Sequence, residues 1–190
     1  TDLLKEVGYD KAPATWEELQ DAATKLAARG KDMYGFGADL AEPTSAFMFA
    51  RQNGSELFDK SGKPLFDKKP FVEAVDYLDS FIQNGSAPKA DLGLDVSQTF
   101  GSTGIVPMFI SGPWMITAIT KDAPDIEGKW ATAVLPKKEN NMSSTGGANL
   151  AMFESSKNEK NGMKLIEFLA RPENQLTFFK NSNSLPTSHK

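Results

Sequence analysis

The run MFISGPWMITAI, residues 108–119, places a tryptophan directly after a Gly-Pro pair and between two apolar segments. A buried strand over 105–110, a turn at Gly112-Pro113 and a following helix would put Trp114 in the first turn of that helix. Ligands of open α/β sheets bind beyond the carboxyl ends of the strands. An exposed indole there would offer a flat apolar face to the C–H face of a sugar ring. The alternative is that Trp114 belongs to the core.

A carboxylate, a hydroxyl and an aromatic ring follow a second predicted strand, over 34–38. Glu42 would stand at the start of the next helix, where the helix dipole favours a negative charge. It could accept hydrogen bonds from ligand hydroxyls, or it could simply stabilise the helix. Thr44 is a second polar candidate for the same contact, and Phe47, one turn further on, is expected in the core or in the wall of the site.

The stretch TGGANLAMF provides a third candidate segment. Gly146 and Gly147 precede a predicted strand over 149–153, and glycines let a ligand approach backbone N–H groups closely. Asn149, which begins the strand, would lie on the same wall. A plain turn is the alternative explanation for the two glycines.

No catalytic residue, metal ligand or cofactor site is expected. The absence of cysteine excludes disulfides, thiol catalysis and cysteine-bound zinc. The single histidine, His189, is the second-last residue, a poor position for a catalytic triad or a histidine-based metal site. No carboxylate pair is marked out for glycoside hydrolysis, and no glycine-rich nucleotide loop is present.

Composition narrows the class of protein further. The net charge is −4, and lysine and arginine are scattered along the chain, so no nucleic-acid partner is expected. No apolar stretch approaches the roughly 18 residues that span a membrane. The chain has no initiator methionine and its first residues already resemble a helix, which favours a fragment of a longer protein.

Helical and extended patterns alternate along the chain, which predicts an α/β fold with a parallel or mixed sheet. The predicted helices lie at 2–8, 15–30, 43–52, 70–83, 95–100, 113–120, 158–169 and from 172 onward, and the predicted strands at 34–38, 105–110, 129–135 and 149–153. Thr15 and Glu18 form a capping-box pattern. One apolar face of the fourth helix is expected to consist of Phe71, Val75, Leu78 and Ile82, with Ala74 and Phe81 on its margins. Residues 137–147 are expected to be a polar linker.

The sequence resembles the extracellular solute-binding proteins of carbohydrate ABC transporters, the maltose-binding-protein-like family. Matching pieces occur in the family's order across nearly the whole chain. They are TDLLKEVGYDKAPATWEELQDAATKL, YGFGADLAEP, NGSELFDKSGKPLF, PFVEAVDYL, MFISGPW, VLP, GGANLAMF, KNEKNGMKLIEFLARPENQ and SLPT.

The resemblance implies a type II periplasmic-binding-protein-like architecture, in which two α/β lobes with mixed sheets flanked by helices enclose the ligand in a cleft. It assigns residues 1–136 to the second lobe and residues 137–190 to a crossover and return into the first lobe, so the two-lobe architecture is incomplete here. It gives Trp114 the role of stacking on a sugar ring and Glu42 that of a polar contact, and it places the double glycine along the cleft. Where maltose-binding protein has a stacking aromatic two residues after that acid, this chain has Thr44, which argues against a maltodextrin ligand.

The expected function is therefore sugar capture and delivery to the membrane subunits of an ABC permease, without catalysis. The expected location is the outer face of the cell membrane, through a lipid anchor, or the periplasm. A carbohydrate-active hydrolase and a binding protein for a non-sugar solute are the alternatives. The apolar residues of the last segment need burial, so the isolated chain is expected to self-associate or to pack back on itself. They are Leu165, Ile166, Phe168, Leu169, Phe178 and Phe179.

Overall fold

The computed structural model describes residues 1–38, 43–90, 92, 95–101 and 103–187. The chain divides into two compact units. Unit 1 consists of Thr1–Ile110 and Asp122–Ser144, and unit 2 of Ser111–Lys121 and Thr145–Lys190. Each unit is described by itself below.

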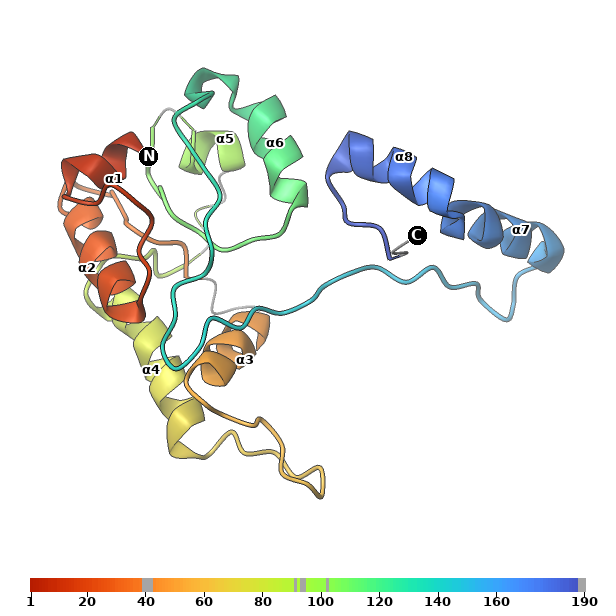
Figure 1. Ribbon diagram of the computed structural model, residues 1–190, viewed down its shortest axis with the longest axis horizontal. Helices are drawn as coiled ribbons and strands as arrows, with labels where there is room; N and C mark the ends of the chain where they lie inside the picture. The colour runs from red at the N-terminus through yellow and green to blue at the C-terminus, as the bar shows by residue number, and fades with distance from the viewer. Residues whose placement is uncertain (39–42, 91, 93–94, 102, 188–190) are drawn as a thin grey trace. The chain divides into compact units, whose positions relative to one another are not determined.

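Helices dominate both units (Figure 1). The helices of unit 1 are α1 (Asp2–Glu6), α2 (Trp16–Ala27), α3 (Pro43–Gln52), α4 (Lys69–Gln83), α5 (Val96–Thr99) and the 3₁₀ helix η1 (Pro124–Ile126). Those of unit 2 are α6 (Trp114–Asp122, whose last residue falls in unit 1), α7 (Glu159–Ala170) and α8 (Pro172–Ser182). Each predicted helix is confirmed, with shifts of a few residues at the ends.

Local sequence signals account for these helix boundaries. The Thr15 side chain accepts a hydrogen bond from the backbone N–H of Glu18 (3.2 Å), and the Glu18 carboxylate accepts one from the backbone N–H of Ala14 (2.7 Å). The predicted capping box of α2 is thereby confirmed, with its carboxylate reaching one residue further back than usual. Proline occupies the first turn of α4 and of α8, where its missing N–H costs no intrahelical bond.

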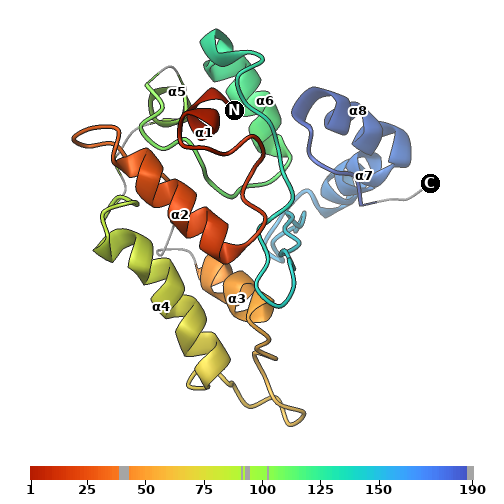
Figure 2. The same ribbon diagram turned by 60° about the vertical axis from the view of Figure 1, so that its left-hand side comes forward.

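The core of unit 1 lies where α2, α3 and α4 pack side by side, as both ribbon views show (Figures 1 and 2). Trp16 stacks on Tyr77 with the ring centroids 4.2 Å apart, and Phe49 packs against both rings. The predicted face of α4 is turned slightly toward its margin, because Val75 is 36 % exposed while the marginal Ala74 and Phe81 are buried with Leu78.

The described residues include extended segments but no strand ladder. Among the described residues, β-pairing consists of isolated bridges between Thr15 and Lys137, Gly37 and Phe109, and Phe58 and Pro64. The predicted strands 34–38 and 105–110 do run in parallel, since Tyr34 donates to the carbonyl of Ile105 (2.9 Å) and Gly37 to that of Met108 (2.8 Å).

The predicted strands at 129–135 and 149–153 are not paired into strands among the described residues. Both stretches are extended, yet residues 130–135 and 149–152 form no backbone hydrogen bond with another described residue. Alternating apolar residues favour an extended backbone, but a strand also requires a neighbouring backbone with which to pair. The expected mixed sheet is therefore not seen in this part of the chain.

The predicted polar linker begins as a well-anchored segment of unit 1. Lys137 donates its N–H to the carbonyl of Ala14 (3.0 Å), and its own carbonyl accepts the N–H of Trp16 (3.1 Å). The ammonium of Lys138 donates to the carboxylate of Glu17, and this hydrogen bond lowers the pKa of Glu17. Lys137 and Lys138 are thus fixed to the start of α2, and the backbone N–H groups of Glu139 and Asn140 donate to the Gln52 carbonyl at the end of α3.

Gly35 in the predicted strand 34–38 has a backbone neighbour at very short range. A Cβ atom on Gly35 would lie 2.0 Å from the carbonyl oxygen of Ala23 in α2. We expect Gly35→Ala to lower the free energy of unfolding by about 2 kcal/mol, because backbone atoms cannot move aside as a side chain can. Urea denaturation measures this loss.

Gly30→Ala is the matched control, since its Cβ would meet only the Met33 side chain at 3.6 Å. If the two alanine variants have the same free energy of unfolding, the prediction is contradicted, because α2 and the 34–38 segment can then move apart without loss of stability.

Candidate ligand-binding site

Trp114 is the first residue of α6 and belongs to unit 2. The helix starts at the preceding residues, because the Gly112 carbonyl accepts the N–H of Met115 (3.0 Å) and the Pro113 carbonyl accepts that of Ile116 (3.1 Å). Trp114 is 53 % exposed, so the alternative that it is a core residue is wrong. Its indole lies over the backbone of Gly112, within 2.0 Å of where a Cβ would be.

A contact between distant residues holds α6 within unit 2. The Nδ2 amide of Asn183 donates to the Oγ1 of Thr117 (2.6 Å), and Thr117 lies one helical turn after Trp114. Asn183 ends α8 in the left-handed conformation (φ 56°), which asparagine tolerates better than most residues. No short sequence motif links Asn183 to α6.

The candidates from the start of α3 belong to unit 1. Thr44, the second residue of α3, is exposed. Phe47 is half-buried, and its ring packs against those of Phe66 (5.3 Å) and Phe71 (6.0 Å). Phe47 therefore contributes to the core, and its ligand contact stays a prediction. Glu42 lies outside the described residues.

The double-glycine segment of unit 2 is open to solvent. Gly146, Gly147 and Asn149 are all exposed, and no atom lies within 4 Å of a Cβ built on either glycine. The two glycines are therefore not explained by close packing against a neighbouring element. Neither is in the left-handed region that glycine commonly supplies in turns.

The candidates are thus divided between the units: Thr44 and Phe47 in unit 1, and Trp114 with the 146–149 segment in unit 2. None of the described candidate residues has a titratable side chain of the kind that general acid–base catalysis requires. No three histidine, aspartate or glutamate side chains come together as a metal site in the described part of the chain. None of the helices that could be searched there is long and apolar enough to span a membrane.

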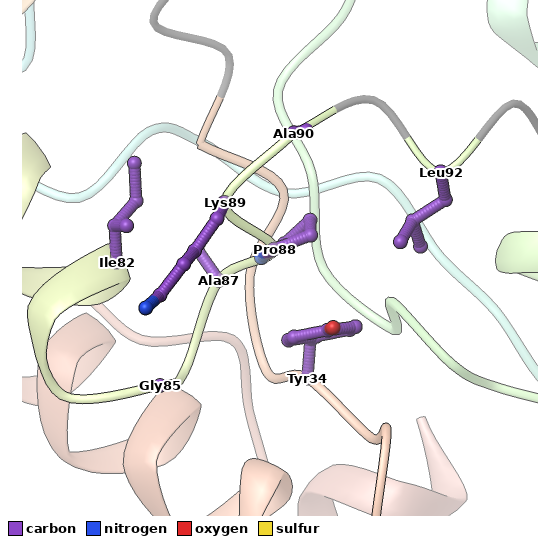
Figure 3. Close-up of a pocket in the computed structure, with 8 residues that line it drawn as sticks. All are labelled: Tyr34, Ile82, Gly85, Ala87, Pro88, Lys89, Ala90 and Leu92. Carbon is purple, nitrogen blue, oxygen red and sulfur yellow. The ribbon is translucent and has the colours of Figure 1, made fainter.

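A separate hollow of about 330 Å³ lies in unit 1 (Figure 3). Its lining is mainly apolar, with the Tyr34 ring on one side and the Lys89 side chain extending on the other. None of the candidate ligand residues that the structure describes lines it, and its described lining presents few hydrogen-bonding groups to a polyhydroxylated ligand.

Solved structures share this fold. The sugar-binding protein MalE of Xanthomonas citri is 32 % identical and superposes with a TM-score of 0.75 over 97 % of this chain and 48 % of its own. An ABC transporter solute-binding protein of Thermotoga lettingae, solved with α-D-tagatose, is 26 % identical with a TM-score of 0.83, over 97 % and 50 % of the two chains.

Curated relatives agree. A maltooligosaccharide ABC transporter solute-binding lipoprotein of Streptococcus pneumoniae (strain R6) is 25 % identical over 98 % of this chain and 45 % of its own length. The chain spans about half the length of the curated relatives it matches. The family model described as "Bacterial extracellular solute-binding protein" matches residues 1–176. Since this match covers most of the sequence, the chain belongs to the bacterial extracellular solute-binding proteins.

Proposed function

We propose that this chain is part of the carbohydrate-binding component of an ABC import system. The observation that carries the proposal is the half-exposed indole of Trp114 at the start of α6, in a chain whose relatives are sugar-binding proteins. A flat aromatic face of this kind stacks on sugar rings, and aromatic anchors dominate the free energy of many binding sites.

The other residues predicted to contact the sugar keep their roles in this proposal. Thr44 and Glu42 supply hydroxyl and carboxylate partners for sugar hydroxyls, and Phe47 supplies part of the apolar wall. Gly146, Gly147 and Asn149 offer backbone and amide groups from a segment that is open to solvent. The sugar is bound and released unchanged, and the membrane subunits of the permease receive it on the outer side of the membrane.

The lobe assignment is part of the same proposal. Residues 1–136 form second-lobe material, and residues 137–190 are a crossover and a return into the first lobe. In the full-length protein the extended segments 129–135 and 149–153 pair with strands outside this chain and complete the mixed sheets. The neighbours' extent supports this, because each solved structure is about twice as long as the part that matches.

A ligand screen on the full-length protein tests the proposal. We use thermal shift with maltotriose, a galactooligosaccharide and D-tagatose, and with spermidine and an amino-acid mixture as non-sugar solutes. A sugar that binds is expected to raise the melting temperature, because binding to the native state stabilises it by mass action. A response to spermidine or to amino acids alone would favour the non-sugar alternative, and steady release of shorter sugars would favour a hydrolase.

Self-association of the isolated chain is a separate prediction from unit 2. Helices α7 and α8 expose large apolar side chains, namely Met163, Leu165, Phe168, Leu169, Leu176 and Phe178. Burying such a side chain is worth about 1.5–3 kcal/mol, so we expect the 190-residue chain to form dimers or larger species at micromolar concentration.

Light scattering after size-exclusion chromatography measures the mass. Phe168→Lys with Phe178→Lys is expected to restore a monomer, whereas Lys164→Glu on the exposed side of α7 changes charge without removing apolar surface. A clean monomer of the unaltered chain at high micromolar concentration would contradict the prediction.

A further inference from the structure

The indole of Trp114 occupies the space in which a side chain at position 112 would begin. A Cβ on Gly112 would lie 2.0 Å from Cζ3, 2.2 Å from Cη2 and 2.5 Å from Cε3 of Trp114. Carbon atoms in contact are normally about 3.5–4.0 Å apart. The benzene part of the indole can therefore lie here only because residue 112 has no side chain.

Backbone conformation does not explain this glycine. Gly112 is absent from the glycines in the left-handed region, which in the described chain include Gly8, Gly54 and Gly128. It also differs from Gly146 and Gly147, whose Cβ positions are empty to 4 Å. Position 112 requires a glycine because the three atoms nearest to its Cβ position all belong to the Trp114 ring, whereas the Cβ positions of Gly146 and Gly147 are unoccupied.

We infer that Gly112 is a positioning residue, which seats the indole of Trp114 in a fixed orientation before sugar binds. One part of the ring rests on the Gly112 backbone, while the residue as a whole remains 53 % exposed. Gly112 also precedes the first turn of α6, where its carbonyl accepts the N–H of Met115. The same residue thus fixes the helix start and supports the ring.

The inference rests on the proposed function, in which Trp114 binds sugar. A ring that is already oriented loses less side-chain freedom when the ligand arrives, so pre-organisation increases affinity. An alanine at 112 would move the indole from its seat without removing it. We therefore expect Gly112→Ala to weaken sugar binding by about three- to tenfold, the usual cost of ordering one side chain.

The first experiment needs no ligand. The full-length protein is labelled with 5-fluorotryptophan, and the ¹⁹F resonance of Trp114 is identified by its loss in Trp114→Phe. Gly112→Ala is expected to shift or broaden this resonance in the sugar-free protein. Gly30→Ala is the matched control, because its Cβ meets only the Met33 side chain at 3.6 Å, and it should leave the resonance in place. An unchanged Trp114 resonance in Gly112→Ala overturns the inference.

The second experiment is a double-mutant cycle on sugar affinity, with the sugar from the maltotriose, galactooligosaccharide and D-tagatose panel that binds most tightly. Calorimetric titration of Gly112→Ala, Trp114→Ala and the double variant shows whether the two residues act together. If Gly112 acts through the ring, adding Gly112→Ala to Trp114→Ala weakens binding no further. Additive losses would show that Gly112 acts by another route and overturn the inference.

The two arms separate the inference from the proposed function. Unchanged affinity in Trp114→Ala contradicts sugar stacking, while the ¹⁹F shift in Gly112→Ala still tests whether the glycine seats the ring. If Gly112→Ala fails to fold, the double variant decides. If the variant with both Gly112→Ala and Trp114→Ala folds, removal of the indole has relieved the clash, which supports the inference. If this double variant also fails to fold, the inference is overturned.

Discussion

Trp114→Ala is expected to weaken sugar binding by the full-length protein by about thirtyfold or more, because the loss of an aromatic anchor typically costs over 2 kcal/mol. The indole is half exposed, is seated on Gly112 and begins a helix, so it can present a face without rearranging the backbone. Trp114→Phe, which keeps a smaller ring, should lose less affinity than the alanine variant. Calorimetric titration with the sugar chosen in the thermal-shift screen measures both.

Phe58→Ala is the matched control for this experiment. Phe58 is also an exposed aromatic residue, at 49 %, but it belongs to unit 1 and packs edge-on against Phe66. Its removal should leave sugar affinity within error of the unaltered protein. If Trp114→Ala binds sugar as tightly as Phe58→Ala does, Trp114 is a surface residue without a role in the site.

Helices were predictable because their signals are local. The capping box at Thr15 and Glu18 marks the start of α2 within four residues of sequence, and Pro70 marks the first turn of α4. The face of α4 was less predictable. A helical wheel places Val75 on the apolar face and Ala74 and Phe81 on its margins, but the packing against α2 and α3 buries Ala74 and Phe81 and leaves Val75 partly exposed.

Strands were less predictable because pairing is not local. The 34–38 segment pairs with 105–110, which lies about 70 residues later in the sequence. Residues 130–135 form an apolar run that is also extended, yet they form no backbone hydrogen bond with another described residue. Periodicity predicts an extended backbone, whereas the partner is fixed by the tertiary structure.

Residue types predicted which side chains could form the site, but not how these side chains are oriented. The Gly-Pro-Trp run after an apolar segment correctly indicated an indole at the start of a helix, but it left open whether Trp114 lies in the core, which its 53 % exposure decides. The direction of the ring over Gly112 depends on rotamer and backbone geometry that the sequence does not encode locally. The hydrogen bond from Asn183 to Thr117 joins residues 66 apart, so no short motif could reveal it.

Gln52, the last residue of α3, is a polar residue in the interior of unit 1. It is fully buried, its Oε1 accepts the indole N–H of Trp16 (2.8 Å), and its Nε2 donates to the carbonyl of Met142 (2.8 Å). Its backbone carbonyl also accepts the N–H of Glu139 (3.0 Å). This one residue therefore joins the core at Trp16 to the anchored segment that leads on to the 146–149 candidates.

Gln52→Ala is expected to lower the free energy of unfolding by about 3 kcal/mol, since it leaves the buried indole N–H of Trp16 without its acceptor, removes the donor to the Met142 carbonyl and opens a cavity. Urea denaturation of the full-length protein measures the loss. Gln83→Ala is the control, because Gln83 is exposed and its side-chain amide donates to the Asp79 carboxylate (3.1 Å). A loss for Gln52→Ala no larger than that for Gln83→Ala would contradict the role of the buried amide.

Gln52→Glu adds a test with a pH signature. An ionised carboxylate at this position could accept from Trp16 but could not donate to the Met142 carbonyl, and burial would raise its folded-state pKa above the unfolded value of about 4.3. Between those two pKa values the folded state binds more protons, so its stability falls as pH rises. We therefore expect the deficit of Gln52→Glu relative to the unaltered protein to be largest at pH 7 and to shrink toward pH 5, where the protonated acid can again donate to Met142. A deficit that stays constant over this range would show that the amide donor is not what holds the 137–143 segment to α3.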